Sequence, residues 1–276
     1  MMGRRSGEIG IFVPGFMMTD GKDIFNRTER LVGPAAMQRL QRSRVVVFGV
    51  GGVGSWCAEA LVRSGIGHLT IVDADCVCAS NVNRQLMATT RTIGAVKVDA
   101  LRERLLEIDP DADVEAVRDI YTEENRDRFD LASYDYIVDA IDSLHNKASL
   151  ILRASEAPGM LLSSMGAALK MDPTRVRVAE FWEVRGCPLG AALRKKFRKE
   201  GTFPAKRIPC VFSDEVLPNR GADREEEKGG LFAKAVINGT AAPVTGIFGL
   251  TLAGLITEDI CRKAWEEEKH RETPAK

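Results

Sequence analysis

The sequence lacks any C-x-x-C cysteine pair, and it has no excess charge of either sign. Its six cysteines are spread over 276 residues, an arrangement that fits neither a disulfide framework nor a zinc site. We therefore expect a protein of the reducing cytoplasm. Lys and Arg together number 39, and so do Asp and Glu. A nucleic-acid partner would have to bind a local basic patch, because the protein as a whole has no net charge to attract it.

We expect neither a secretory signal nor a membrane span. Residues 9–18 form a short apolar stretch after two arginines, but the stretch contains glycine and proline and has no small-residue cleavage site. We interpret residues 1–21 as a disordered tail. The uncharged run 235–256 reaches membrane-span length. Its many small and polar residues favour a loop that leads into a buried helix, so we expect no membrane partner.

Strands and helices alternate along the first part of the chain. The sequence predicts strands at 44–49, 68–73, 113–118, 134–140 and 159–164, and helices at 56–64, 96–108, between the third and fourth strands, and at 144–156. This alternation predicts an α/β fold with a Rossmann-like, doubly wound and mostly parallel sheet. Beyond residue 175 the pattern is looser, with a strand at 175–181, a basic helix near 190–199, a strand at 208–212 and a mobile polar loop at 214–230.

A glycine-rich loop lies where the first predicted strand passes into a helix. Gly49, Gly51 and Gly54 satisfy the pattern G-x-G-x-x-G, and Gly52 lies between them. Glycine permits the tight turn and lets backbone N–H groups approach phosphate, and the helix N-terminus favours negative charge. Asp73 ends the next strand nineteen residues later, where a carboxylate can hold ribose hydroxyls. The loop predicts nucleotide binding but does not by itself choose between ATP, NAD and FAD.

Three charged residues favour nucleotidyl transfer over hydride transfer. Arg84 and Lys97 would bring two cations to a triphosphate and offset the charge that builds on departing pyrophosphate. Asp142 follows the end of a predicted strand, where its carboxylate could hold Mg²⁺. Each residue has an ordinary alternative: Lys97 as a solvated helix residue, Arg84 as a surface ion-pair partner and Asp142 as a helix cap. Their combination is what points to ATP with Mg²⁺.

The chain resembles the HesA–MoeB–ThiF superfamily, which has the fold of the ubiquitin-activating enzymes. The resemblance covers about residues 22–165 and rests on motifs in the family's order and spacing: the loop Gly49–Ser55, Asp73, Asn81-x-x-Arg84-Gln85, Lys97 and Asp139-x-x-Asp142. The nucleotide-binding residues that it implies are Gly49, Gly51, Gly52, Gly54, Asp73, Asp75, Asn81, Arg84, Gln85, Lys97 and Asp142. The implied catalytic residues are Arg27, Arg84, Lys97 and Asp142. Arg27 lies in a segment similar to one whose arginine reaches across a homodimer to the partner's ATP.

Within the superfamily, the chain is most similar to the tRNA threonylcarbamoyladenosine dehydratases. This likeness rests on Arg30–Gly33, Gly51–Trp56, Asp139–Ser143, Asp172–Thr174, Cys210–Ser213 with Glu215, and the segment 239–250. It implies an ATP-binding domain at 22–185, and a C-terminal part of the same domain, 186–276, that completes the active site and faces tRNA. The implied reaction is ATP-dependent cyclisation of the threonylcarbamoyl group beside the tRNA anticodon. A cysteine desulfurase or sulfur-acceptor system is a further candidate partner.

Two other functions stay open. The first alternative is an adenylyltransferase that activates the C-terminal glycine of a ubiquitin-like or sulfur-carrier protein, although the sulfur-carrier activators of the superfamily usually hold zinc with two C-x-x-C pairs, which this chain lacks. The second is a dinucleotide-binding oxidoreductase or a non-catalytic nucleotide sensor. An acyl-adenylate that closes on a group in the same substrate needs no enzyme nucleophile, so we interpret Cys187 and Cys210 as structural.

A basic segment follows the nucleotide-binding part. Seven cationic residues lie within fourteen positions, with two phenylalanines interleaved, a composition that suits an RNA phosphate backbone. The alternative is a solvated helix face. The candidate tRNA contacts are Arg194, Lys195, Lys196, Arg198, Lys199, Lys206 and Arg207.

Overall fold

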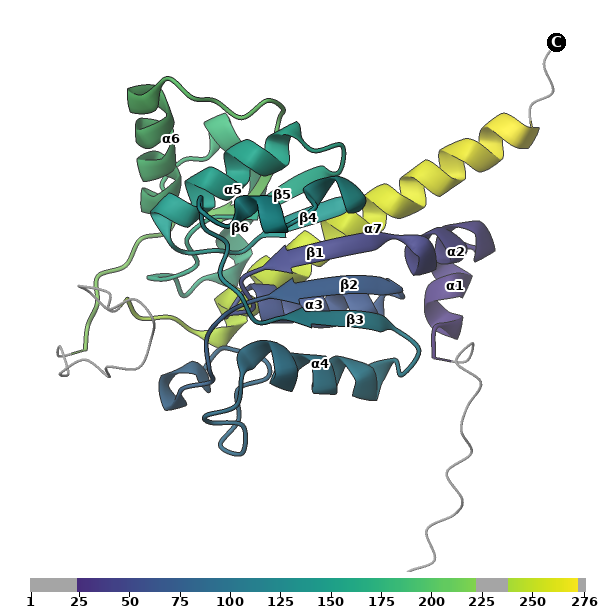
Figure 1. Cartoon of the computed structure of the whole chain (residues 1–276), viewed down its shortest axis with the longest axis horizontal. Helices are drawn as coiled ribbons and strands as arrows, with labels where there is room; N and C mark the ends of the chain where they lie inside the picture. Colours follow the sequence, from purple (N-terminus) through teal and green to yellow (C-terminus); the bar gives the residue numbers. More distant parts are fainter. Residues whose placement is uncertain (1–23, 222–237, 273–276) are drawn as a thin grey trace, which may run out of the picture.

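One seven-stranded sheet forms the centre of the computed structural model, which describes residues 24–221 and 238–272 (Figure 1). The strands are β1 (Arg44–Phe48), β2 (His68–Val72), β3 (Asp113–Val117), β4 (Tyr136–Asp139), β5 (Met160–Ser164), β6 (Val176–Glu180) and β7 (Pro209–Ser213), in the order β3-β2-β1-β4-β5-β7-β6. Every neighbouring pair is parallel except β6 and β7. The predicted doubly wound, mostly parallel sheet is confirmed.

Alternate residues of β1 divide the core into two layers. Val45 and Val47 belong to the cluster on one face of the sheet, and Val46 and Phe48 belong to the cluster on the other, because successive strand side chains point to opposite faces. The first face is covered by α2 (Pro34–Arg42), α3 (Gly54–Arg63), α4 (Lys97–Ile108) and α7 (Ala242–Glu272), and the second by α5 (Leu144–Glu156) and α6 (Pro188–Glu200). α1 (Asn26–Val32) precedes α2.

The prediction of a helix between β3 and β4 is wrong. Two single-turn 3₁₀ helices, Arg126–Arg128 and Leu131–Ser133, occupy that interval. The Asn125 side chain accepts a hydrogen bond from the Thr122 amide, and the Asp130 side chain accepts one from the Ala132 amide. Asn and Asp side chains that bind nearby amides compete with the helical hydrogen-bond pattern. The other predicted elements agree with the structure to within a few residues, but the tail 1–21 and much of the predicted loop 214–230 lie outside the described residues.

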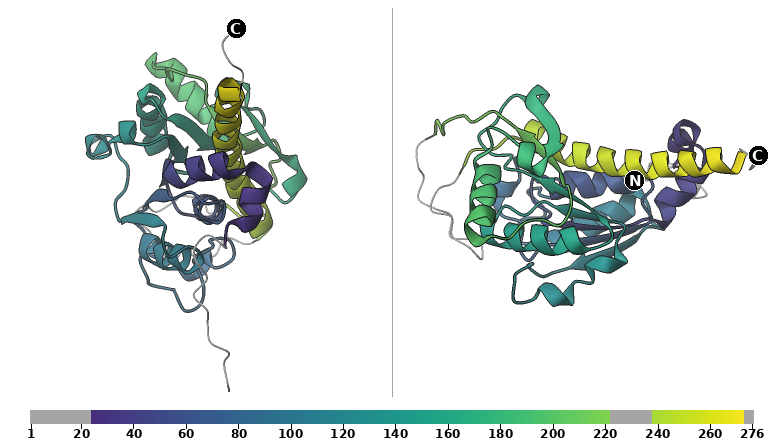
Figure 2. Two further views of the ribbon diagram at one scale, coloured as in Figure 1. Left: turned by 90° about the vertical axis from the view of Figure 1, so that its right-hand side faces the viewer. Right: turned by 90° about the horizontal axis from the view of Figure 1, so that it is seen from above.

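α7 is the buried helix that we expected from the run 235–256, and it begins inside that run at Ala242. Ala242–Arg271 is long and apolar enough to cross a membrane by length and composition, but 61% of its most apolar window is buried within the protein. Gly249 allows α7 to approach α3 closely, since a Cβ at this position would lie 2.4 Å from the Val53 carbonyl oxygen. Figure 2 shows α7 along one side of the molecule, with its C-terminal half passing α2.

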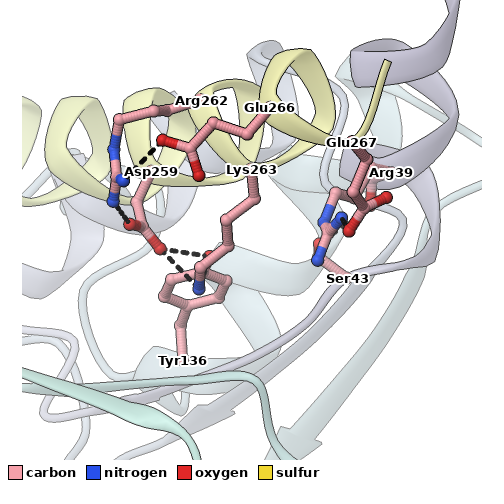
Figure 3. Close-up of polar contacts among 8 residues, drawn as sticks. All are labelled: Arg39, Ser43, Tyr136, Asp259, Arg262, Lys263, Glu266 and Glu267. Atoms are coloured by element: carbon pink, nitrogen blue, oxygen red, sulfur yellow. Dashed lines mark hydrogen bonds and ion pairs between the residues drawn. The ribbon is translucent and has the colours of Figure 1, made fainter. Parts of the chain in front are cut away.

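Charged side chains fasten α7 to the amino ends of the strands (Figure 3). The Asp259 carboxylate accepts a hydrogen bond from the Tyr136 hydroxyl at 2.8 Å, and it pairs with Lys263 at 2.7 Å and Arg262 at 2.5 Å. The Trp265 indole donates to the Val32 carbonyl at 2.7 Å. α7 is thus fixed to β4 and to the chain that precedes β1.

The opposite edge of the sheet contains the topological switch point. β1 pairs with β2 on one side and with β4 on the other, so that Phe48 lies beside both Val72 and Asp139 at the carboxyl ends. The chain leaves these strands in different directions, toward helices on opposite faces. Ligands of open α/β sheets bind in the crevice that such a reversal creates.

Candidate active site

A cavity of about 560 Å³ lies at this switch point. The loops that follow β1 to β5 form its walls, together with the start of α6, the segment before α7 and the first turn of α7. The sequence-predicted residues that line it are Gly49, Gly51, Gly52, Asp73, Asp75, Arg84, Gln85, Lys97 and Asp142. The structure therefore collects, at one place, residues that are up to about ninety positions apart in the chain.

The glycine loop leaves no room for larger side chains at its two ends. Gly49 has φ +86°, and a Cβ there would lie 2.8 Å from the Ala140 carbonyl oxygen. A Cβ at Gly54 would lie 1.8 Å from the Gly49 carbonyl oxygen. At Gly52 a Cβ would enter the space between Arg84 and Thr245, 3.3 Å from each. The glycines bring the backbone close to β4 and leave space between the loop and the Arg84 side chain.

Asp73 links the glycine loop to the end of β2. Its two carboxylate oxygens accept backbone hydrogen bonds from Val50 at 3.0 Å and from Asp75 at 2.9 Å. Burial raises the pKa of Asp73, and the nearby charge of Lys97 opposes this rise. Each oxygen retains a lone pair for a further donor such as a ribose hydroxyl. Asp73 thus shapes the loop and also faces the cavity.

Lys97 is not a solvated helix residue. It is 6% exposed at the start of α4, and its ammonium lies 2.8 Å from the nearer Asp75 carboxylate oxygen and 3.8 Å from Asp73. These two carboxylates hold the Lys97 side chain at the cavity wall. A bound anion would meet a cation whose position is already fixed.

The residues of the Asn-x-x-Arg-Gln element have two roles: Asn81 holds the turn, and Arg84 and Gln85 line the cavity. The Asn81 side chain accepts from the Cys78 amide at 3.0 Å and does not line the cavity. Arg84 donates to the Ser80 carbonyl at 2.8 Å. Burial lowers the pKa of Arg84, and the charge of Asp142 opposes this shift. The Trp56 indole of α3 donates to the Arg84 carbonyl at 3.0 Å, which fixes the element to the helix behind the glycine loop.

Gln85 supplies evidence that the cavity is made for a polar ligand. The side chain is 6% exposed and lines the cavity. Its amide oxygen is buried, with no hydrogen-bond partner among the described residues. Buried polar atoms in proteins are nearly always paired, and an amide can present either its oxygen or its nitrogen to a ligand. A nucleotide with hydroxyl, amino and phosphate groups satisfies this requirement.

The two aspartates that follow β4 have different surroundings. Asp139 is fully buried and pairs with Lys147 at 2.7 Å, and the Ser163 hydroxyl donates to it at 2.6 Å. Burial raises the pKa of Asp139, while the Lys147 charge opposes the rise. Asp142 is exposed and lines the cavity opposite Arg84. Asp139 therefore belongs to the interior, and Asp142 is the carboxylate that a ligand can reach.

A metal site made by protein residues alone is absent from residues 24–221 and 238–272, in which no group of three or more His, Cys, Asp or Glu residues could hold an ion. Asp142 and the phosphates of a nucleotide together supply the oxygen ligands that Mg²⁺ prefers, and Mg²⁺ is commonly held by one or two carboxylates and substrate phosphates. The residues present therefore fit an ion that arrives with its nucleotide.

Arg27 does not line the cavity of its own chain. It is exposed on α1, and α1 lies beside the amino ends of the strands, at the opposite end of the sheet (Figure 1). Within one chain this arginine cannot contact a nucleotide bound at the carboxyl ends. A role in the active site would require a second copy of the chain.

Several cavity residues were missed by the sequence analysis. Asn146, on the first turn of α5, is 7% exposed and lines the wall. Thr240 and Thr245 close the cavity from the α7 side, and the Asn83 side chain donates to the Thr240 carbonyl at 2.9 Å. The Thr- and Gly-rich segment 239–250 was the available signal for the two threonines, whereas nothing in the local sequence singles out Asn146.

The predicted basic segment is divided in the structure. Lys195, Arg198 and Lys199 are exposed on α6. Lys206 lies at the amino ends of the strands, where its ammonium donates to the carbonyls of Ala157 and Gly159, both at 2.5 Å, and burial lowers its pKa. The remaining members have protein partners: Arg194 the Phe181 carbonyl, Lys196 Glu200, and Arg207 Glu183.

Both cysteines that we interpreted as structural are buried. Cys210 in β7 is fully buried, and burial raises the pKa of its thiol far above the ordinary value. Cys187 is 2% exposed, and its sulfur accepts the Gly190 amide at the start of α6. Reactive cysteines have low pKa values and accessible sulfurs, so neither has the surroundings of a nucleophile.

Comparisons with known proteins match most of the chain to ATP-using enzymes. The profile of the ThiF family matches residues 25–273. A tRNA threonylcarbamoyladenosine dehydratase of Bacillus subtilis is 40% identical over 232 residues, which are 84% of this chain and 90% of that protein. The crystal structure of the Escherichia coli tRNA N6-threonylcarbamoyladenosine dehydratase in complex with ATP superposes with a TM-score of 0.76 at 33% identity, covering 89% of this chain and 96% of that one. A sulfur carrier protein adenylyltransferase of Thermus thermophilus is 38% identical over 44% of this chain.

Proposed function

This chain belongs to the ThiF family, and we propose that it catalyses the ATP-dependent dehydration of threonylcarbamoyladenosine in tRNA. The observation that carries the proposal is the cavity at the switch point, where the glycine loop meets Arg84, Lys97 and Asp142. The likeness to an ATP-bound dehydratase over 96% of its length supports the substrate. We assign the reaction to the cytoplasm.

ATP occupies the cavity with its phosphates along the glycine loop. The loop leads into the N-terminus of α3, where backbone N–H groups and the helix dipole favour an anion. Asp73 accepts hydrogen bonds from the ribose hydroxyls. Arg84 and Lys97 lie at the wall as fixed cations, and they stabilise the charge that develops on pyrophosphate as it leaves. Asp142 is the residue that would hold Mg²⁺, and the ion would neutralise phosphate charge when bound.

The reaction proceeds in two steps. A carboxylate oxygen of the threonyl group attacks the α-phosphorus of ATP, the bond to the β-phosphate oxygen breaks, and pyrophosphate leaves. A group within the same threonylcarbamoyl substituent then attacks the activated carboxyl carbon and releases its proton, and AMP leaves with the former carboxylate oxygen. The substrate thereby loses one molecule of water in total. Ring closure of a tethered group has a high effective molarity, so the burial of Cys187 and Cys210 is no obstacle.

A homodimer would give Arg27 a role in this reaction. The residue is exposed far from its own cavity, which supports action in the site of a partner subunit. Arg27→Ala should lose activity alone, as should Asp142→Ala. If Arg27 acts across the interface, mixing the two inactive variants under conditions of subunit exchange should restore one working site per heterodimer. Absence of any recovery, with heterodimers demonstrated by mass, would contradict action in the partner's site.

ATP–pyrophosphate exchange separates the three functions that the sequence left open. We expect exchange that depends on tRNA carrying threonylcarbamoyladenosine. Exchange that depends instead on a carrier protein with a C-terminal glycine would support the adenylyltransferase alternative. Absence of exchange with either partner, with nucleotide still bound, would indicate a nucleotide sensor or an oxidoreductase. The control is the same tRNA without the threonylcarbamoyl group, because it lacks the carboxylate that ATP would activate.

A further inference from the structure

An aromatic cluster outside the active-site cavity lies beside the basic helix. The Trp182 ring contacts the Phe203 ring with centroids 5.9 Å apart, and the Arg198 guanidinium lies 5.5 Å from the centre of the Trp182 ring. Phe181 packs edge-on against Trp182 from the core side at 5.2 Å. We call Trp182, Arg198 and Phe203 the aromatic platform.

The platform is supported from below and open above. Phe181 and Phe197 are fully buried beneath it, and their rings are 5.7 Å apart. The Trp182 amide donates to the Glu180 carboxylate at 2.7 Å, which fixes the turn that carries the indole. Phe203, in contrast, is 57% exposed. Exposure of a large aromatic ring costs hydrophobic stabilisation, and this one rests on ordered partners rather than on a free loop.

The charge around the platform favours an anionic partner. Residues 180–207 contain eight cationic and three acidic side chains. The three acids already have partners: Glu180 the Trp182 amide, Glu183 Arg207 and Glu200 Lys196. Arg185 and Arg198 are close enough to Arg194 to lower its pKa further after the effect of burial. Arg198 is exposed beside the Trp182 ring, and Lys199, the next residue of α6, is exposed as well. A negatively charged ligand would relieve this repulsion.

The platform lies within reach of the active site along α6. Leu189, on the first turn of α6, lines the cavity, and Arg198 follows nine residues later in the same helix. At a helical rise of about 1.5 Å per residue the two positions are about 13 Å apart along the axis. This distance corresponds to about four stacked nucleotides at about 3.4 Å each. A strand whose threonylcarbamoyl group reaches the ATP in the cavity can therefore extend to the platform.

We propose that the aromatic platform binds an unpaired base of the tRNA anticodon loop by stacking, with Arg198 and Lys199 on the adjoining phosphates. Aromatic rings with neighbouring cations are the usual means of holding single-stranded nucleic acid. The platform thus selects a looped-out strand near the modified adenosine. This inference rests on the proposed function, because it takes tRNA as the substrate.

Substitution of Phe203 tests the platform. The probe is an anticodon stem–loop RNA that contains threonylcarbamoyladenosine, and the measurement is its Kd by fluorescence anisotropy at fixed salt. We expect Phe203→Leu to raise Kd by about 5- to 100-fold through loss of one stacked base, since the leucine retains an apolar side chain without the ring. Phe203→Trp should bind as tightly as the wild-type protein. Phe203 is exposed, so a thermal melt should show that all variants remain folded.

Salt dependence distinguishes stacking from charge. Phe203→Leu should leave the slope of log Kd against log salt unchanged, whereas Lys199→Ala should make the slope shallower by about one phosphate contact. Equal RNA affinity of Phe203→Leu and wild type would overturn the platform. If instead wild type itself neither binds the RNA nor shows RNA-dependent pyrophosphate exchange, the proposed function fails together with the platform. If Phe203→Leu bound the RNA normally but no longer bound some other protein, that result would also contradict the assignment of the platform to RNA.

Discussion

The two ends of the central sheet use polar side chains in opposite ways. At the amino ends, Asp259 is surrounded by Tyr136, Arg262 and Lys263, and these groups bind one another (Figure 3). At the carboxyl ends, Asp142 faces a cavity and the Gln85 amide oxygen is buried without a partner in the described chain. β4 links the two ends, because Tyr136 is its first residue and Asp142 lies three residues beyond its last. Pairing at one end stabilises the fold, and the Gln85 amide oxygen at the other end, unpaired among the described residues, leaves an acceptor for a ligand.

Lys147 is an exception to this comparison, because it is a paired charge at the carboxyl ends of the strands. It lies at the carboxyl ends, yet it is fully buried with Asp139 and donates to the Ile141 carbonyl at 3.0 Å. Lys147→Met should lower the free energy of unfolding by about 3–5 kcal/mol, because a buried carboxylate would lose its partner. Burial raises the pKa of Asp139, and protonation removes the buried charge that Lys147→Met leaves without a partner. The loss of unfolding free energy, measured in urea melts, should therefore be largest at neutral pH and smaller as the pH falls.

A double variant provides the control for the pair. Lys147→Met with Asp139→Asn removes both charges together, and we expect it to be more stable than Lys147→Met alone at neutral pH. Equal stability of the single and double variants would mean that the ion pair does not hold the end of β4.

Asp142→Ala should have the largest effect on activity with little effect on stability. We expect adenylation to fall by about 100- to 1,000-fold, since the change removes an electrostatic group from the site of phosphate charge. The side chain is exposed, so its loss leaves no cavity in the core. Single-turnover pyrophosphate release measures the effect. Normal turnover in this variant would mean that Asp142 does not hold Mg²⁺.

Asp259→Ala is the converse change at the amino ends. We expect a loss of about 1.5–3 kcal/mol in the free energy of unfolding, through lost hydrogen bonds to charged groups, and unchanged ATP affinity. Burial raises the pKa of Asp259, but the hydrogen bonds from Lys263 and Tyr136 and the charge of Lys263 outweigh it and lower the pKa overall. The wild-type advantage should be complete above about pH 4 and decline as the pH falls toward the folded-state pKa. An advantage that persists in stronger acid would exclude the Asp259 charge as its cause.

Asp73→Asn should produce the smallest of these changes. The amide retains an acceptor for only one of the two backbone donors, Val50 and Asp75. We expect ATP to bind about 5- to 100-fold more weakly, as when a buried acceptor is lost, in isothermal titration of the folded variant. An unchanged affinity would place the ribose elsewhere in the cavity.

The sequence predicted the local features of the molecule better than the distant contacts. The glycine loop, Asp73 and the strand that ends at Asp139 were identified because turn chemistry and β-branched runs are local signals. The burial of Lys97 depends on Asp73 and Asp75, and the division between Asp139 and Asp142 depends on Lys147 one turn into α5. Thr245 reaches the cavity only because Gly249 lets α7 approach α3. Such contacts join segments that no local pattern connects, so they required the structure.

The mass of the modified nucleoside tests the proposed reaction most directly. Purified protein, ATP and Mg²⁺ are incubated with tRNA that carries threonylcarbamoyladenosine, and the nucleosides are then analysed by mass spectrometry under conditions that preserve the ring. We expect a product lighter than the substrate nucleoside by one water, formed together with AMP and pyrophosphate, and absent with Asp142→Ala. A nucleoside of unchanged mass, from folded wild-type protein that binds both ATP and the tRNA, would contradict the proposed dehydration.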